Sequence, residues 1–295
     1  MKPIHLPSLY PLLIAASLAL FAWARSGALP MEAAVMIASI AALALGAWLE
    51  RRWPYRRDWQ PSRGDTRTDA TSALVLAAVV DPLLKAALPL LAIEGLRRWL
   101  PAGAGFPVTV PFAAQVLLAL LWIELAKYAS HRLHHKLPAL WWLHALHHSS
   151  TRLYWLNGLR FHPLNHLINT TLAMAPLWAL GVPAAVLLAT AAITQPVLML
   201  QHANLGFRHG WINRVFSTHE VHRSHHALHA DQADGNYGSA LVVWDQVFGT
   251  WRAPSLQAGA DEMGLFARSA GYPGGASYGQ QLRSFFAVRQ GCCGV

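Results

Sequence analysis

Charged residues and cysteines are both scarce in this chain. Aspartate, glutamate, lysine and arginine make up 13% of the 295 residues. A soluble domain usually carries about 25%. This shortfall, together with 54% hydrophobic residues, indicates a membrane protein rather than an ordinary soluble domain. The two cysteines, Cys292 and Cys293, are adjacent, so the sequence offers no CxxC metal motif and no pair that could staple the fold.

The net charge of +9 is distributed in a way that excludes nucleic acid as the partner. The basic residues form no stripe with interleaved aromatics, and many of them flank apolar runs, where they would contact anionic lipid. The densest run of arginines extends from Arg51 to Arg67. By the positive-inside rule, this loop is predicted to lie in the cytoplasm.

Apolar runs predict an all-α fold with several membrane spans. Four runs have the composition of a span, at 9–23, 31–49, 71–93 and 108–129, and the first two form a hairpin turned at Ser26 and Gly27. A fifth run, 167–200, is broken near Gly181 and Pro183. Each of its halves is short for the roughly 20 residues that a span requires, so we expect a hairpin that enters the membrane and returns. Both histidine-rich regions then fall on the cytoplasmic side.

Histidine is the residue whose distribution departs most from chance. All but one of the 16 histidines lie between residues 131 and 229. Eight of these histidines form one HxxxH pair and two HxxHH triplets. Residues four apart share a helix face, and we expect all three nitrogens of each triplet to converge. The eight histidines in these motifs are His131, His135, His144, His147, His148, His222, His225 and His226.

Eight imidazoles are too many for one metal ion, because a mononuclear zinc site uses three or four ligands. The sequence therefore predicts two ions. Imidazole suits zinc, copper, iron and nickel, and the motifs contain no thiolate that would narrow the choice. Two other classes stay open. A metal transporter would need polar residues along its spans, and a bis-histidine haem protein would need histidines paired across helices instead of triplets.

Several longer segments resemble one known family. They are "HRLHHKLPALWWLHALHHSS", "NGLRFHPLNHLI", "QHANL" and "HEVHRSHHALHADQADGNYGSALVVWDQVFGTW". Together they are similar to the fatty acid hydroxylase/sterol desaturase superfamily of membrane di-iron enzymes. The resemblance covers a histidine-box catalytic domain (115–252). The apolar runs and composition divide the rest into an N-terminal transmembrane hairpin and basic loop (1–70), a third span and loop (71–114) and a C-terminal tail (253–295) with an amphipathic piece near 280–288.

The resemblance implies a multi-span helical membrane protein with a cytosolic, histidine-rich metal-binding cap. It implies a di-iron centre that uses O2 and external electrons to hydroxylate or desaturate a C–H bond of a bilayer lipid, such as a fatty acyl chain or a sterol. The sequence has no flavin or nicotinamide fingerprint, so a separate reductase or small electron carrier is expected as the electron donor.

By position, the resemblance adds His202 to the eight motif histidines as a ninth metal ligand and His162 as a further candidate. His134 falls at a variable position of the first motif and is left out. His219 stands where a turn residue would be commoner, and is interpreted as a neighbour of a ligand or a surface residue.

Three polar residues are candidates for orienting the ligands. Glu124 lies seven residues before His131, and an acid within a span is costly and usually functional. It could receive the second N–H of a ligand imidazole. A carboxylate that only packs helices together is an equal alternative. Asp234 and Asn236 follow the last triplet and could do the same, although their Asp-Gly context also predicts a turn.

Overall fold

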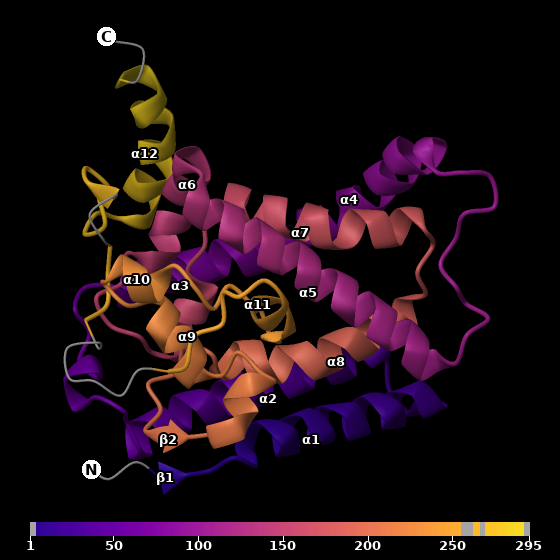
Figure 1. Ribbon diagram of the computed structural model, residues 1–295, viewed down its shortest axis with the longest axis horizontal. Coiled ribbons are helices and arrows are strands. Elements are labelled where there is room, and N and C mark those ends of the chain that lie inside the picture. Colours follow the sequence, from indigo (N-terminus) through magenta and orange to yellow (C-terminus); the bar gives the residue numbers. More distant parts are fainter. Residues whose placement is uncertain (1–3, 255–261, 266–268, 292–295) are drawn as a thin grey trace.

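The computed structural model describes residues 4–254, 262–265 and 269–291; Cys292 and Cys293 lie outside them. Within these residues, four helical runs are long and apolar enough to cross a membrane, which confirms the multi-span helical fold. They are α1 (Leu9–Trp23) with a π-helical continuation (Ala24–Ala28), α2 (Met31–Arg52), a run of α3 (Thr66–Val75), a π-helical turn (Leu76–Val80) and α4 (Asp81–Leu96), and α5 (Phe112–Lys136). In Figure 1, α1, α2 and α5 run lengthwise through the molecule.

The fifth apolar run folds as two antiparallel helices, α7 (Pro163–Ala179) and α8 (Ala184–Leu200). The turn between them uses Gly181 at φ +73°, a conformation that favours glycine. Each helix has 17 residues and is about 25 Å long, shorter than the ~30 Å hydrocarbon core. α8 nevertheless lies centrally, because it packs against α1, α2 and α5.

Short elements gather at one end of these helices, where they form the cap on the left of Figure 1. The cap includes the described part of α12, which contains the predicted amphipathic segment. A two-stranded parallel sheet is the only extended pairing longer than a single bridge in the described chain. The remaining elements are β1 (Ile4–His5), β2 (Phe207–Arg208), α6 (Pro138–His148), α9 (His219–His225), α10 (Ala230–Ala233), α11 (Val243–Val247), α12 (Tyr278–Gly291) and 3-10 turns at Arg57–Trp59, Arg97–Trp99, Trp155–Leu159 and Gly210–Arg214.

Helix α5 differs from the predicted span 108–129 at both ends. It begins only at Phe112, because prolines flank the preceding residues and Pro111 occupies the N-cap position. The carbonyls of Val108 and Val110 accept hydrogen bonds from the side chain of Gln115 instead. At its other end the helix continues to Lys136. The first histidine pair is therefore carried on the same rigid helix as the span.

Small side chains let the central helices approach closely. Ala119 of α5, Ala173 of α7 and Ala192 of α8 are all fully buried in one apolar cluster. Small residues at such contacts are typical of helix packing in membranes. The outward faces carry exposed leucines, among them Leu12 at 65% and Leu90 at 69% exposure, as expected of surfaces that contact lipid.

Buried ion pairs join the arginine-rich loop region to the cap. Asp69 is fully buried and accepts hydrogen bonds from Arg160 Nε, the Tyr154 hydroxyl (2.5 Å) and Asn157 Nδ2 (3.0 Å). One carboxylate thus fixes the position of the segment 154–160. Because that segment leads into α7, it connects the loop to the helices that carry the site.

Replacing Asp69 by alanine should lower the free energy of unfolding by about 3–5 kcal/mol, because it leaves the buried Arg160 guanidinium without its counterion. Asp58→Ala is the matched control, since Asp58 is 50% exposed where it pairs with Arg56. The control should cost about 1 kcal/mol or less. Denaturant titration of both variants in detergent measures the difference. Equal losses would contradict a special role for Asp69.

Candidate metal centre

Nine histidines form two neighbouring groups at the cap end of the helices. In each group the side-chain nitrogens lie within 4.8 Å of one another. The first group takes residues from α5, α6 and α9, and the second takes residues from α6 and α9 and from the positions just after α8 and α9. The first group is His131, His135, His144, His148 and His225; the second is His147, His202, His222 and His226.

The grouping corrects one expectation. The three nitrogens of an HxxHH triplet do not converge on one point. His144 and His148 join the first group, whereas His147 joins the second. In α9, likewise, His222 and His226 share a group and His225 joins the other. The first and last histidines of each triplet are four residues apart and share a helix face. The middle histidine directly precedes the last, so it is rotated from it by about 100° and faces the other group.

A sharp bend between α5 and α6 brings the first two motifs together. α5 ends at Lys136, and Leu137 is extended (φ −103°, ψ 121°) before Pro138 begins α6. Proline disfavours helical geometry in the residue before it. As a result, His131 Nε2 lies 3.0 Å from His144 Nε2.

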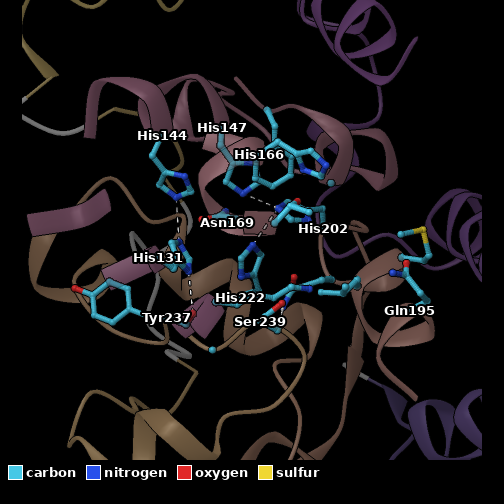
Figure 2. Close-up of a pocket in the computed structure, with 18 residues that line it drawn as sticks. His131, His144, His147, His166, Asn169, Gln195, His202, His222, Tyr237 and Ser239 are labelled. Atoms are coloured by element: carbon cyan, nitrogen blue, oxygen red, sulfur yellow. Dashed lines mark hydrogen bonds between the residues drawn. The ribbon is translucent and has the colours of Figure 1, made fainter. Parts of the chain in front are cut away.

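The turn after the last triplet orients two imidazoles of the first group through its backbone. His131 Nδ1 donates to the carbonyl of Tyr237 (2.9 Å), and His225 Nδ1 donates to the carbonyl of Gly235 (2.8 Å). When Nδ1 carries the proton, the lone pair of Nε2 is left for a metal. Figure 2 shows His131 between Tyr237 and His144.

Asn165 of α7 orients a third imidazole and explains why one histidine stays outside the groups. Its Oδ1 accepts from His144 Nδ1 (2.9 Å), and its Nδ2 donates to His134 Nε2 (3.0 Å). His134 Nδ1 donates to the carbonyl of Ser130 (2.8 Å). Both nitrogens of His134 are therefore engaged by protein, and His134 holds Asn165 in the orientation that His144 requires.

The second group is a compact set of four imidazoles. His202 Nε2 lies 3.2 Å from the Nε2 atoms of His147 and His226 and 3.0 Å from that of His222. His226 and His222 are themselves 3.0 Å apart at Nε2. Four neutral imidazoles cannot satisfy one another at such distances, because each carries a single N–H. A shared ion with bonds of about 2 Å satisfies all four.

Burial keeps these imidazoles neutral, which is the form that binds metal. Desolvation, followed by the influence of neighbouring histidines, lowers the pKa of His222 and His226 well below the usual value, and lowers that of His202 to about 3. His225 Nε2 is buried and has no hydrogen-bond partner among the described residues. A metal ion would supply that partner, so the donor set fits two ions.

The remaining candidate histidines lie elsewhere. His162 caps α7, where its Nδ1 accepts from the backbone N–H of Leu164 (3.1 Å), and it belongs to neither group. His219 is buried, so its interpretation as a surface residue is wrong. It interacts with the Tyr10 hydroxyl (3.2 Å) and the carbonyl of Phe207 (3.2 Å).

The three polar candidates have different partners. Asp234 Oδ1 lies 3.5 Å from His135 Nδ1, where a ligand-orienting carboxylate was expected. Within the described residues, the side chain of Asn236 forms hydrogen bonds with residues 221, 224 and 252 and with no imidazole. Its side-chain amide donates to the carbonyl of Arg252 (3.0 Å), and its φ of 55° belongs to the turn. Glu124 Oε2 accepts from the backbone N–H groups of residues 240 (2.9 Å) and 241 (2.7 Å), so it braces the chain beyond the turn and does not orient a ring directly.

Sequence reasoning missed several residues that support the groups. Trp141 is buried against the rings of His135 and His148, at 5.1 and 5.4 Å between centroids. The carbonyl of Arg160 accepts from His147 Nδ1 (3.0 Å). A backbone carbonyl has no signature in a sequence, and a single tryptophan or asparagine has no spacing to mark it.

A cavity of about 260 Å³ opens beside both groups. It extends among α5, α7 and α8, and its wall includes His131, His147, His202 and the apolar side chains Leu198 and Met199. Figure 2 shows that the labelled histidines lie together while Gln195 of α8 lies apart from them. A molecule in this cavity would therefore contact the histidine groups at one end and the apolar helices at the other.

Fold and site together define a helical membrane protein with two all-imidazole groups beside a cavity between its apolar helices. The family model "Fatty acid hydroxylase" matches residues 116–250. The chain is also 34% identical over 261 residues to the ornithine lipid hydroxylase OlsE of Rhizobium tropici, covering 86% of this chain and 77% of that protein. No solved structure matches. This chain belongs to the fatty acid hydroxylase family and is a membrane-bound oxidoreductase that hydroxylates a lipid.

Removing one imidazole from either group should lower the bound metal. We expect His148→Ala and His222→Ala to reduce the metal content from two ions per chain toward one and to abolish turnover. His209→Gln is the control, because His209 is likewise buried but lies outside both groups. Elemental analysis of the purified variants measures the stoichiometry. Full turnover in His148→Ala would exclude His148 as an essential ligand.

Asn165→Leu should weaken metal binding about 10–100-fold, the usual cost of losing a group that orients a ligand. The leucine side chain cannot accept the hydrogen bond that His144 Nδ1 donates to Asn165 Oδ1. Competition with a chelator measures the affinity, and Asn165→Asp, which keeps the acceptor, should retain most of it. An unchanged affinity in the leucine variant would show that Asn165 does not orient His144.

Proposed function

We propose that this protein is an O2-dependent di-iron monooxygenase that hydroxylates a C–H bond of a bilayer lipid at the cytoplasmic membrane surface. The observation that carries the proposal is the pair of buried imidazole groups at the end of a cavity between apolar helices. In this proposal the nine histidines of the two groups ligate two iron ions. Bound iron would supply the reductive activation of O2, which no side chain provides.

The protein's own residues orient the metal ligands and limit the access of water. The carbonyls of Tyr237, Gly235 and Arg160 and the amide of Asn165 fix the tautomers of four imidazoles, so their Nε2 atoms face the ions. Trp141 covers one side of the first group and limits the access of water. The lipid enters through the cavity, whose wall is apolar at Leu198 and Met199.

The stoichiometry requires an electron donor. One oxygen atom of O2 enters the lipid as a hydroxyl group, and the other leaves as water after taking up two electrons and two protons. The sequence has no flavin or nicotinamide fingerprint, so we propose a separate reductase or small electron carrier. It would dock on the cap, the end of the molecule that carries the histidine groups.

Charge supports a cytoplasmic cap. The arginine-rich loop and the histidine groups lie at the same end of the molecule, where Arg152 pairs with Asp65 (2.7 Å). Basic residues concentrate on the cytoplasmic side of membrane proteins. The substrate class is suggested by the relative named for ornithine lipid: we propose a lipid with an amino-acid headgroup.

Single turnover under labelled oxygen tests the function. The purified protein, reconstituted with total bacterial lipid and reduced chemically, should add one ¹⁸O atom from ¹⁸O2 to a lipid, detected by mass spectrometry. His222→Ala, treated identically, should give no product. A product that has lost two hydrogens without gaining oxygen would contradict hydroxylation, and label derived from water would contradict the use of O2.

A further inference from the structure

The cavity beside the histidine groups contains a lysine that neither metal binding nor helix packing explains. Lys127 lies on α5, four residues before His131, and lines the cavity. Residues at this spacing share a helix face. Within the described part of the chain, the ammonium group of Lys127 has no hydrogen bond or ion pair. A cation within a span is costly unless it has a partner.

The nearest acidic residue on the same helix does not supply that partner. Glu124 attracts Lys127 electrostatically, but the two do not approach within ion-pair distance. Glu124 Oε2 instead accepts two backbone N–H groups, those of Ala240 (2.9 Å) and Leu241 (2.7 Å). The ammonium group of Lys127 is therefore available to bind a ligand that enters the cavity.

The cavity wall near Lys127 adds neutral hydrogen-bonding groups. Asn169 and Thr170 of α7 and Gln195 of α8 line it. The volume of about 260 Å³ equals roughly nine water molecules, which suits a headgroup but not a whole lipid. One cation among neutral amides and a hydroxyl matches a ligand with a single negative charge.

We propose that Lys127 binds the single negative charge of the substrate's headgroup, a carboxylate or a phosphodiester, and so positions a nearby C–H bond at the histidine groups. The inference rests on the proposed function but not on its amino-acid headgroup, because a phosphodiester carries the same single negative charge. Lys127 and His131 are separated by about 6 Å of helix rise. The hydroxylated carbon should therefore lie within a few bonds of the charged group, and not in the middle of a long acyl chain.

Three lipids distinguish the sources of the charge. The reconstituted, metal-loaded protein is given ornithine lipid, the methyl ester of its carboxylate, and phosphatidylglycerol, with the same chemical reductant. The wild type should prefer a charged lipid over the ester. Preference for ornithine lipid identifies a carboxylate, and preference for phosphatidylglycerol identifies a phosphodiester.

Substitution of Lys127 isolates its contribution. Lys127→Met should raise KM for the preferred charged lipid about 10–100-fold, the usual worth of a hydrogen bond to a charged group, with KM for the ester and metal content unchanged. Lys127→Arg should restore most of the preference. Lys85→Met is the matched control, because Lys85 is an exposed lysine in another candidate span.

Two results would overturn this inference while leaving the proposed function standing. One is a wild type that oxidises charged and esterified lipids equally well. The other is a Lys127→Met variant that loses activity equally on both or loses its metal, because a packing role would act in that way. If the loaded wild type oxidises none of the lipids, including those of a total bacterial extract, the proposed function itself fails.

Discussion

Neutral imidazole in a fixed tautomer is the requirement on which the rest of this structure depends. Nine rings, eight of them buried and that of His131 half-buried, can crowd around two points only if they carry no charge and present one chosen nitrogen. Burial achieves the first condition by lowering the pKa of rings such as His222 and His225. The backbone carbonyls of residues 160, 235 and 237 fix the nitrogen that is presented, because they accept hydrogen bonds from Nδ1–H.

The apolar helices serve this requirement by carrying histidines to one end of the molecule. α5 continues past its apolar part to Lys136, so its histidine pair is fixed by the packing of the span. The hairpin of α7 and α8 returns the chain to the same end, where His202 follows α8. Asp69, through Arg160, holds the segment whose carbonyl orients His147. Stability and metal geometry are therefore coupled through the same contacts.

Much of this could be predicted because the signals are local. Apolar runs predicted the spans, and the HxxxH and HxxHH spacings marked eight of the nine grouped histidines; His202 came from the family resemblance. The division of the rings between two groups could not be predicted, because His147 and His148 are adjacent and face different partners. The contacts of Asn165 and Glu124 also escaped prediction, since they depend on segments 21 and more than 100 residues away.

His134 and His162 are as buried as the grouped histidines, but they belong to neither group. Each has a structural partner that the sequence does not mark: Asn165 for His134 and the start of α7 for His162. Anomalous diffraction at the iron edge from crystals of the iron-loaded protein tests the central claim most directly. Two peaks are expected, one within each histidine group. A single peak, or a peak outside both groups, would contradict the claim.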